Sequence, residues 1–542
     1  MIKIQPKRSR RAASVTKSTS APVGGLNVVD AIQGMPTTDA IQLINWIATQ
    51  YGVRCRKGYR EWFIELGAEV RTIMEYSPDR AAAATDAKIF AVTDAAIYDV
   101  TTSGNVPVVS QALAGTDLCG RLSHTSMANS AGTFLLTAAN TGGYRYFDGT
   151  AWATPTFGGG AGQVSGCDPA TFGYVQMWKR RAWFHEVGTT SLWYLAVDSV
   201  TGVATEFDVG PQLEHGGIVS FIARWTIDAG EGIDDYLVIG GENGDILVYK
   251  GTDPASSATF GLVGVWYVGR LPIGQRPSVQ FGGDLLVLTA TGLQPLSYVT
   301  RGGQSLLRSS SVDYLKKIQP LFSELLLDTS DQLGWELALS DSENLLVVLT
   351  PPNGTTAYNQ YALYTNNNTW CEFNNMDMST ALASSDGRFF YGTTDGKVIQ
   401  AFTGFFDNVA YGASTGDGIA GVIQPSYQYF GYPGVTKQMH LIRGNFLAAD
   451  RPGVTAAAIA DFEQNTIVAA PTVGGPGGGA LWDVALWDVA VWSGAQNAYS
   501  DWQSVNAIGY AISGYFRTLC VGETLLASID YIYEPVRGGP QL

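Results

Sequence analysis

Histidine and cysteine are scarce in this chain of 542 residues, and their spacing suits no common site. The four histidines stand at positions 124, 185, 215 and 440, and no two have the spacing of metal ligands on one helix or strand. The five cysteines, at 55, 119, 167, 371 and 520, are odd in number and equally poorly spaced. We therefore expect reduced, mostly buried thiols, no disulfide framework, no zinc site and no cofactor.

Motifs of catalysis are also missing. The sequence has no phosphate-binding loop and no Gly-x-Gly-x-x-Gly between a strand and a helix. Asp483 and Asp488 flank tryptophans, as the acids of sugar hydrolases do, but a glycine-rich segment would hold them poorly. A Ser-His-Asp triad built from distant positions stays open. We expect that the protein is not an enzyme.

Charge is low and unevenly placed. Charged residues make up 15% of the chain, and no run of 18 apolar residues predicts a membrane-spanning helix. The net charge is −15, yet the first 80 residues hold 12 Lys and Arg against 7 Asp and Glu. An acidic body argues against wrapping DNA, which requires neutralised phosphates, but it would suit a channel that repels DNA and lets it slide.

Glycine, aromatic residues and period-two patterns are abundant, and they predict an all-β protein. The chain has 64 Gly, 14 Trp and 26 Tyr. Strand pairs separated by Asp-Gly or Asn-Gly turns restart about every 40–50 residues, the period of propeller blades. Examples are Tyr59–Leu66 with Glu69–Tyr76 across Gly67-Ala68, Lys88–Val92 with Ala96–Val100, and Thr133–Ala138 with Tyr144–Phe147. We predict a β-propeller of five to seven blades over residues 59–403, with two consecutive β-sandwiches as the alternative.

Two segments flank the predicted propeller. Residues 22–58 form a docking segment with a helix over 36–51, because Thr37 and Thr38 are good N-caps and Ile41, Ile44 and Ile47 recur at helical spacing before Gly52. Residues 404–542 form a C-terminal β domain with a Trp-rich arm near 474–495. We expect the two flanking segments to pack together.

The arm and the N-terminal tail are the predicted contact regions. Trp482, Trp487 and Trp492 recur every five residues, so they cannot share one face of a strand or helix and would anchor in several pockets of a neighbour. Residues 1–21 form a basic tail that needs an acidic partner, either protein or nucleic acid, and we predict a protein. The basic residues assigned to subunit or adaptor contacts are Lys7, Arg8, Arg10, Arg11, Arg54, Arg56 and Lys57.

The segment before the propeller carries a family resemblance. Pro22, Gly24 and Gly25 are followed by Met35-Pro36, then by a segment with Asn45, and then by Arg54 to Gly58. In these motifs the sequence resembles tail nozzle proteins of short-tailed bacteriophages, the tail tubular protein B type. Their role is similar to that of packaged-DNA stabilisation proteins. The long basic tail before Ala21 departs from that pattern and leaves its docking partner open.

The resemblance implies a structural role in the virion tail. Such a subunit would form a homohexameric tube below a tail adaptor protein, retain packaged double-stranded DNA and conduct it during ejection. A tail fibre or spike protein would be a further partner, contact with the host envelope would be indirect, and assembly would take place in the host bacterial cytoplasm. The alternative is a receptor- or glycan-binding propeller protein of the tail.

Overall fold

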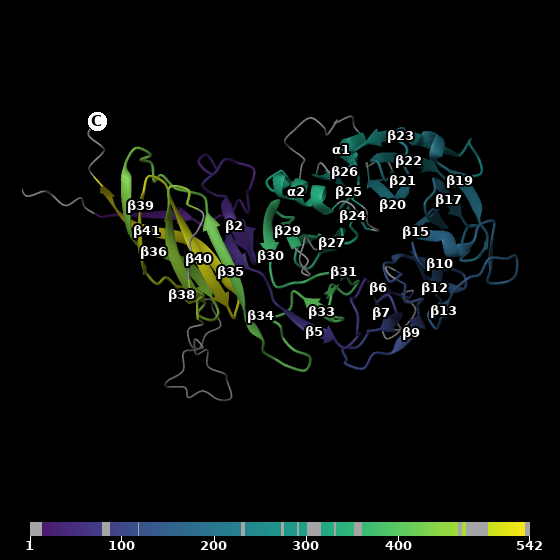
Figure 1. Ribbon diagram of the computed structural model, residues 1–542, viewed down its shortest axis with the longest axis horizontal. Coiled ribbons are helices and arrows are strands. Elements are labelled where there is room, and N and C mark those ends of the chain that lie inside the picture. Colours follow the sequence, from purple (N-terminus) through teal and green to yellow (C-terminus); the bar gives the residue numbers. More distant parts are fainter. Residues whose placement is uncertain are drawn as a thin grey trace, which may run out of the picture.

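The computed structural model describes residues 14–78, 87–116, 119–228, 233–272, 276–289, 292–300, 316–329, 332–351, 360–463, 469–472 and 497–536, and the statements below concern these residues. Strands dominate this part of the chain, and its α-helices are α1 (Leu296–Thr300) and α2 (Gln319–Thr329). Figure 1 shows two parts: a ring of small sheets, and beside it a body of long strands that contains the C-terminal region. The expected all-β class is confirmed.

The ring consists of small antiparallel sheets. Six blades are separate sheets, and the first two hold β6 (Thr72–Tyr76), β7 (Lys88–Val92), β8 (Ala96–Asp99) and β9 (Val109–Ala112), and β10 (Ser123–Asn129), β11 (Gly132–Ala139), β12 (Gly143–Phe147) and β13 (Trp152–Ala153). The next two hold β15 (Phe172–Trp178), β16 (Arg181–Glu186), β17 (Ser191–Tyr194) and β19 (Thr205–Asp208), and β20 (Val219–Asp228), β21 (Ile233–Gly241), β22 (Asp245–Gly251) and β23 (Phe260–Tyr267). The last two hold β24 (Ser278–Phe281), β25 (Asp284–Thr289) and β26 (Gly292–Pro295), and β31 (Thr380–Ala383), β32 (Phe389–Gly392), β33 (Val398–Ala401) and β5 (Tyr59–Phe63). A further blade is formed by β27 (Glu336–Ser340), β28 (Leu345–Leu349), β29 (Gln360–Tyr364) and β30 (Thr369–Phe373).

These sheets close into a β-propeller. Neighbouring sheets contact one another in order, from β31 to β6, β6 to β11, β10 to β15, β15 to β20, β20 to β25, β24 to β27, and β27 back to β31. The strand β5 precedes the ring in the chain but pairs with β33, so one blade joins residues from both sides of the ring. The ring is therefore closed by backbone hydrogen bonds within a blade, which leaves no open edge between first and last sheets.

The long strands form two layers. One sheet holds β1 (Val15–Ser20), β3 (Trp46–Thr49), β4 (Gly52–Cys55), β36 (Thr436–Ala448), β38 (Asn497–Tyr499), β39 (Gln503–Gly509) and β41 (Thr524–Val536), and the other holds β2 (Ala40–Ile44), β34 (Phe406–Asp407), β35 (Asp417–Pro425), β37 (Gly453–Ala460) and β40 (Ile512–Cys520). The layers meet closely, because a Cβ on Gly514 of β40 would lie 2.7 Å from Ile442 Cδ1 of β36. The C-terminal β strands and the N-terminal strands β1 to β4 thus build one sandwich.

The sandwich and the propeller share a sheet. β2 pairs with β35 of the sandwich on one side and, at Ile44, with Glu372 of β30 on the other. One hydrophobic core also runs through both parts and includes Trp370 of the blade and Phe516 of the sandwich. Burial of a continuous apolar core makes relative motion of the two parts costly.

The helix predicted over residues 36–51 is wrong. The structure has β2 and β3 there, separated at Asn45, whose φ of 61° interrupts a regular helix or strand. Tyr51, at the end of the predicted helix, is 85% exposed. The β-branched isoleucines favour strands, and remote strands supply the hydrogen-bond partners that local spacing could not reveal.

Most of the predicted hairpins are confirmed, with one exception. Lys88–Val92 pairs with Ala96–Val100 in β7 and β8, and Thr133–Ala138 pairs with Tyr144–Phe147 in β11 and β12. The predicted pair across Gly67-Ala68 is wrong, because β5 belongs to the blade of β33 and β6 to the blade of β7. Gly67 therefore turns the chain from one blade into the next.

Candidate functional site

The residues that carry the family resemblance gather where propeller and sandwich meet. Gly24 and Gly25 form a tight turn whose amides bond to Thr38 O and Pro22 O, while the next amide, of Leu26, bonds to Trp370 O of β30. A Cβ on Gly24 would lie 1.9 Å from Asp39 Oδ1. Met35 is buried beside this turn region at 7% exposure, whereas Pro36 is exposed. The glycines are required because backbone and carboxylate approach too closely for any side chain.

Asp39 is the polar centre of that turn. Its carboxylate accepts from Lys317 Nζ at 3.0 Å and from Asn27 Nδ2 at 2.7 Å, and Lys317 Nζ also donates to Gly24 O at 2.7 Å. Lys317 lies just before α2, so the contact attaches the N-terminal turn to the propeller. The buried carboxylate is stabilised by charge-assisted hydrogen bonds that fix the position of residues 24–39.

Arg56 and Asp407 form a buried ion pair at the centre of the junction. Arg56 Nη1 donates to Asp407 Oδ1 and Nη2 to Oδ2, both at 2.7 Å, and the side chains are 0% and 2% exposed. Asn45 Oδ1 accepts from Arg56 Nε at 2.8 Å and from Asn374 N at 2.9 Å. All five N–H donors of the guanidinium bond within the chain, since Nη1 and Nη2 also reach Lys57 O and Asn374 O.

Burial and the mutual attraction of the two side chains act in opposite directions on the pKa values of this pair. Desolvation disfavours the charged guanidinium, but the hydrogen bonds and attraction of Asp407 outweigh it, and the pKa of Arg56 lies above its ordinary value. Burial raises the pKa of Asp407, while Arg56 acts in the opposite direction. A bidentate pair of this geometry fixes two segments relative to each other. One is the segment between β4 and β5, which holds Arg56, and the other is β34, which holds Asp407.

Arg54, Arg56 and Lys57 were assigned to contacts with another subunit or the adaptor, and their positions differ. For Arg56 that assignment is wrong, because the residue is fully buried and bonded within its own chain. Arg54 and Lys57 reach the surface in part, at 26% and 40% side-chain exposure, and both pair with Glu343, at 3.1 and 2.6 Å. Their contact with another molecule stays a prediction.

The remaining motif residues also serve the junction. Gly58 passes so close to the backbone that a Cβ there would lie 1.9 Å from Phe406 O, and Gly58 N donates to Gly404 O at 3.0 Å. Asn45 Nδ2 donates to Ala420 O at 2.7 Å, which ties the same side chain to β35. The motif thus fixes how the two parts of the protein join.

The centre of the propeller carries a second polar cluster, which sequence reasoning missed. Arg276 Nη1 donates to Glu336 Oε1 at 2.8 Å and Nη2 to Thr72 Oγ1 at 3.2 Å. Weaker bonds reach Thr380 Oγ1 and Leu122 O, both at 3.4 Å. These partners stand at or just before the first residues of β27, β6, β31 and β10, so one side chain links four blades. An arginine in a turn gives no sequence signal for this role.

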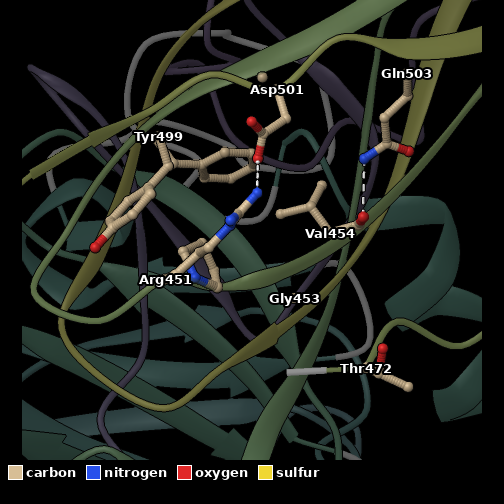
Figure 2. Close-up of a pocket in the computed structure, with 10 residues that line it drawn as sticks. Arg451, Gly453, Val454, Thr472, Tyr499, Asp501 and Gln503 are labelled. Carbon is tan, nitrogen blue, oxygen red and sulfur yellow. Dashed lines mark hydrogen bonds and ion pairs between the residues drawn. The ribbon is translucent and has the colours of Figure 1, made fainter. Parts of the chain in front are cut away.

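A cavity of about 190 Å³ lies in the sandwich beside both ends of the segment 473–496 (Figure 2). Arg451 Nη2 and Asp501 Oδ2 pair at 2.5 Å on its rim, and Gln503 Nε2 donates to Val454 O at 2.8 Å. Thr472 and Tyr499, which line the cavity, flank the segment on its two sides. Trp482, Trp487 and Trp492 themselves lie outside the described residues, as do Lys7, Arg8, Arg10 and Arg11.

Neither a metal-binding cluster nor a membrane-spanning helix occurs in the described part of the chain. No group of three or more His, Cys, Asp or Glu side chains in the described ranges is arranged to hold a metal ion. No helix within those ranges is long and apolar enough to cross a membrane.

Comparisons with known proteins identify no family for this chain. No family model and no curated protein matches the chain. Solved structures with similarity include an extracellular domain from B. thetaiotaomicron, with TM-score 0.40, 12% identity, and coverage of 64% of this chain and 40% of that one. The WD40 β-propeller domain of Doa1 has TM-score 0.36 and 10% identity, covering 64% and 98%. The chain thus spans less than half the length of the bacterial domain. The pairing of its own strands defines the propeller.

Proposed function

We propose that this protein is a structural subunit of a phage tail nozzle, a homohexameric ring or tube below a tail adaptor that retains and conducts double-stranded DNA. The observation that carries the proposal is the position of the resemblance motif. Its residues, from Gly24 to Gly58, hold the sandwich and the propeller in one fixed arrangement. A subunit of a symmetric tube needs such a rigid shape, because its neighbours must repeat the same contacts.

The centre of the propeller supports a particular form of this role. Arg276 joins four consecutive blades by hydrogen bonds where their innermost strands begin, and we place the passage for DNA between subunits and not along the propeller axis. The net charge of −15 for each chain would give a lumen that repels DNA and prevents sticking. A lumen lined mainly by Lys and Arg would contradict the proposal.

Mass measurement of the assembled particle tests the function directly. Native mass spectrometry or mass photometry of the purified chain, alone and with the adaptor, is expected to show a particle of six 57.9-kDa subunits. Electron microscopy of that particle should show a closed ring with a central passage. A monomer or trimer under both conditions would overturn the proposal.

A further inference from the structure

A cavity of about 220 Å³ lies at the end of the propeller where the innermost strands begin. It sits between the blades of β15 and β20, and its lining includes Tyr174, His185, Val187, Ser220 and Glu242. Asn140 from the preceding blade and Leu333 from the loop before β27 complete the walls. Four blades therefore contribute to one cavity that is partly open to solvent, and small ligands generally bind in such concave sites.

His185 provides the sign that the cavity takes a ligand. The residue is only 5% exposed, and its Nδ1 has no hydrogen-bond partner within the described part of the chain. Burial lowers the pKa of His185 to about 4, so the ring is neutral at pH 7 and offers one donor and one acceptor. A buried nitrogen without a partner is unfavourable, and a ligand hydroxyl would supply the missing bond.

Gly173 shapes the floor of the cavity. A Cβ at this position would lie 2.4 Å from Asn140 Oδ1, 2.6 Å from Val187 Cγ2 and 2.7 Å from His185 Cε1. The three lining side chains therefore converge over a residue without a side chain. Only glycine allows this approach, and any larger residue would push them into the open space.

The lining determines the class of ligand. Among the described residues no Lys or Arg lines the cavity, and the carboxylate of Glu242 stands there, so phosphate and carboxylate ligands are disfavoured. Tyr174, Ser220, Asn140, Glu242 and neutral His185 can each bond to hydroxyl groups, while Val187, Ile218 and Leu333 offer apolar contact to C–H faces. The volume is below the roughly 300–1,000 Å³ of sites for drug-sized ligands, which limits the ligand to one ring.

We propose that this cavity binds a single monosaccharide unit, either free or at the end of a glycan. The proposal goes beyond the role in a tail nozzle and does not depend on it. The oligomer measurement and the sugar-binding measurement use different readouts, so either can fail without the other. The site would give each subunit one weak contact with a sugar-bearing surface, and a ring would multiply that contact through its copies.

Ligand-observed saturation-transfer NMR with the full chain tests the proposal. The probes are methyl glycosides of glucose, galactose and mannose, together with N-acetylglucosamine, each in the millimolar range, and inorganic phosphate serves as the anionic comparison. At least one glycoside should give a saturation signal, and phosphate should neither bind nor compete. Absence of a signal for every glycoside, or binding of phosphate alone, would overturn the proposal.

Variants locate the binding. Glu242→Ala is expected to weaken the responding glycoside about tenfold or more, because a ligand hydroxyl loses its charged acceptor. The matched control Glu214→Ala removes the same charge from an exposed residue outside the cavity and should bind as the wild type does. His185→Phe and Gly173→Ala should abolish binding where they fold, as judged by circular dichroism. Unchanged affinity in Glu242→Ala would overturn the proposal whatever the buried variants do.

Discussion

Arg56 and Asp407 are 351 positions apart in the chain, yet two hydrogen bonds of 2.7 Å join them inside the protein. One residue precedes the propeller and the other follows it. The pair therefore closes the chain path around the whole ring and marks the point where the sandwich is attached.

Asp407→Asn is expected to destabilise the protein strongly. The substitution leaves Arg56 charged, buried and without its counter-ion, a change that typically costs about 3–5 kcal/mol. Urea unfolding of the variant and the wild type at pH 7 measures the free energy of unfolding. The control Asp198→Asn breaks an exposed pair with Arg180, whose side chain is 73% exposed, and should change stability by about 1 kcal/mol or less. Equal effects of the two variants would contradict the structural role of the buried pair.

Arg276→Met tests the link at the propeller centre. Methionine keeps the apolar stem but removes the bonds to Glu336, Thr72 and Leu122 O. Because Glu336 is 7% exposed, we expect a loss of about 2–4 kcal/mol in the free energy of unfolding. Arg224→Met, at a residue 49% exposed and paired with Asp235, is the matched control. A thermal midpoint for Arg276→Met no lower than that of the control would refute the link.

His185, which is buried, and His124, which is half-buried, predict a loss of stability in mild acid. Burial lowers the pKa of His124 to about 3 and of His185 to about 4, against an ordinary value of about 6.5 in the unfolded chain. At a pH between the folded-state and the unfolded-state pKa of a histidine, that histidine binds a proton in the unfolded chain but not in the folded one. Stability is therefore retained above pH 6.5 and falls below it, by up to about 1.4 kcal/mol per pH unit for each histidine. Urea unfolding between pH 7 and pH 5 measures the slope, and an equal slope in the double variant His124→Gln, His185→Gln would contradict the assignment.

Gly58→Ala tests the close approach at the junction. The added methyl group would lie 1.9 Å from the backbone oxygen of Phe406, which cannot move as a side chain could. We expect little soluble protein, or a loss of several kcal/mol in stability. Gly159→Ala, where a Cβ meets nothing within 4 Å, is the control and should express normally. Normal expression and melting of both variants would show that the junction is less tightly packed than described.

Local turn chemistry explains why most of the hairpins could be predicted from the sequence. At Asp148-Gly149 the carboxylate accepts from the amides of Thr150 and Ala151, and Gly149 takes a φ of 97° that glycine favours. Both requirements lie within four residues, so the sequence shows them directly. Each blade of the ring contains short hairpins of this kind, so the blades could be predicted from the sequence.

The junction could not be predicted in the same way. Ile41, Ile44 and Ile47 satisfy helical spacing, whereas the strand partners of Ile44, Glu372 in β30 and Val422 in β35, lie more than 300 positions away. Their β-branched side chains, together with Asn45 in a left-handed conformation, were the available signals for strands. Asp407 and Arg276 stand in segments without periodicity, and only the folded chain shows what they contact.

The pairing of β5 with β33 has a consequence for protein synthesis. A ribosome releases residues 59–63 long before residues 398–401, and at roughly 5–20 residues per second the delay is tens of seconds. Strands β1, β2, β4 and β5 each lack at least one permanent neighbour during that time, because β30, β33, β35 and β41 are translated later, whereas β3 pairs with β4 as soon as both have emerged. The start of the polypeptide therefore carries open strand edges until its end emerges, and exposed edges of this kind are where a partly synthesised chain aggregates.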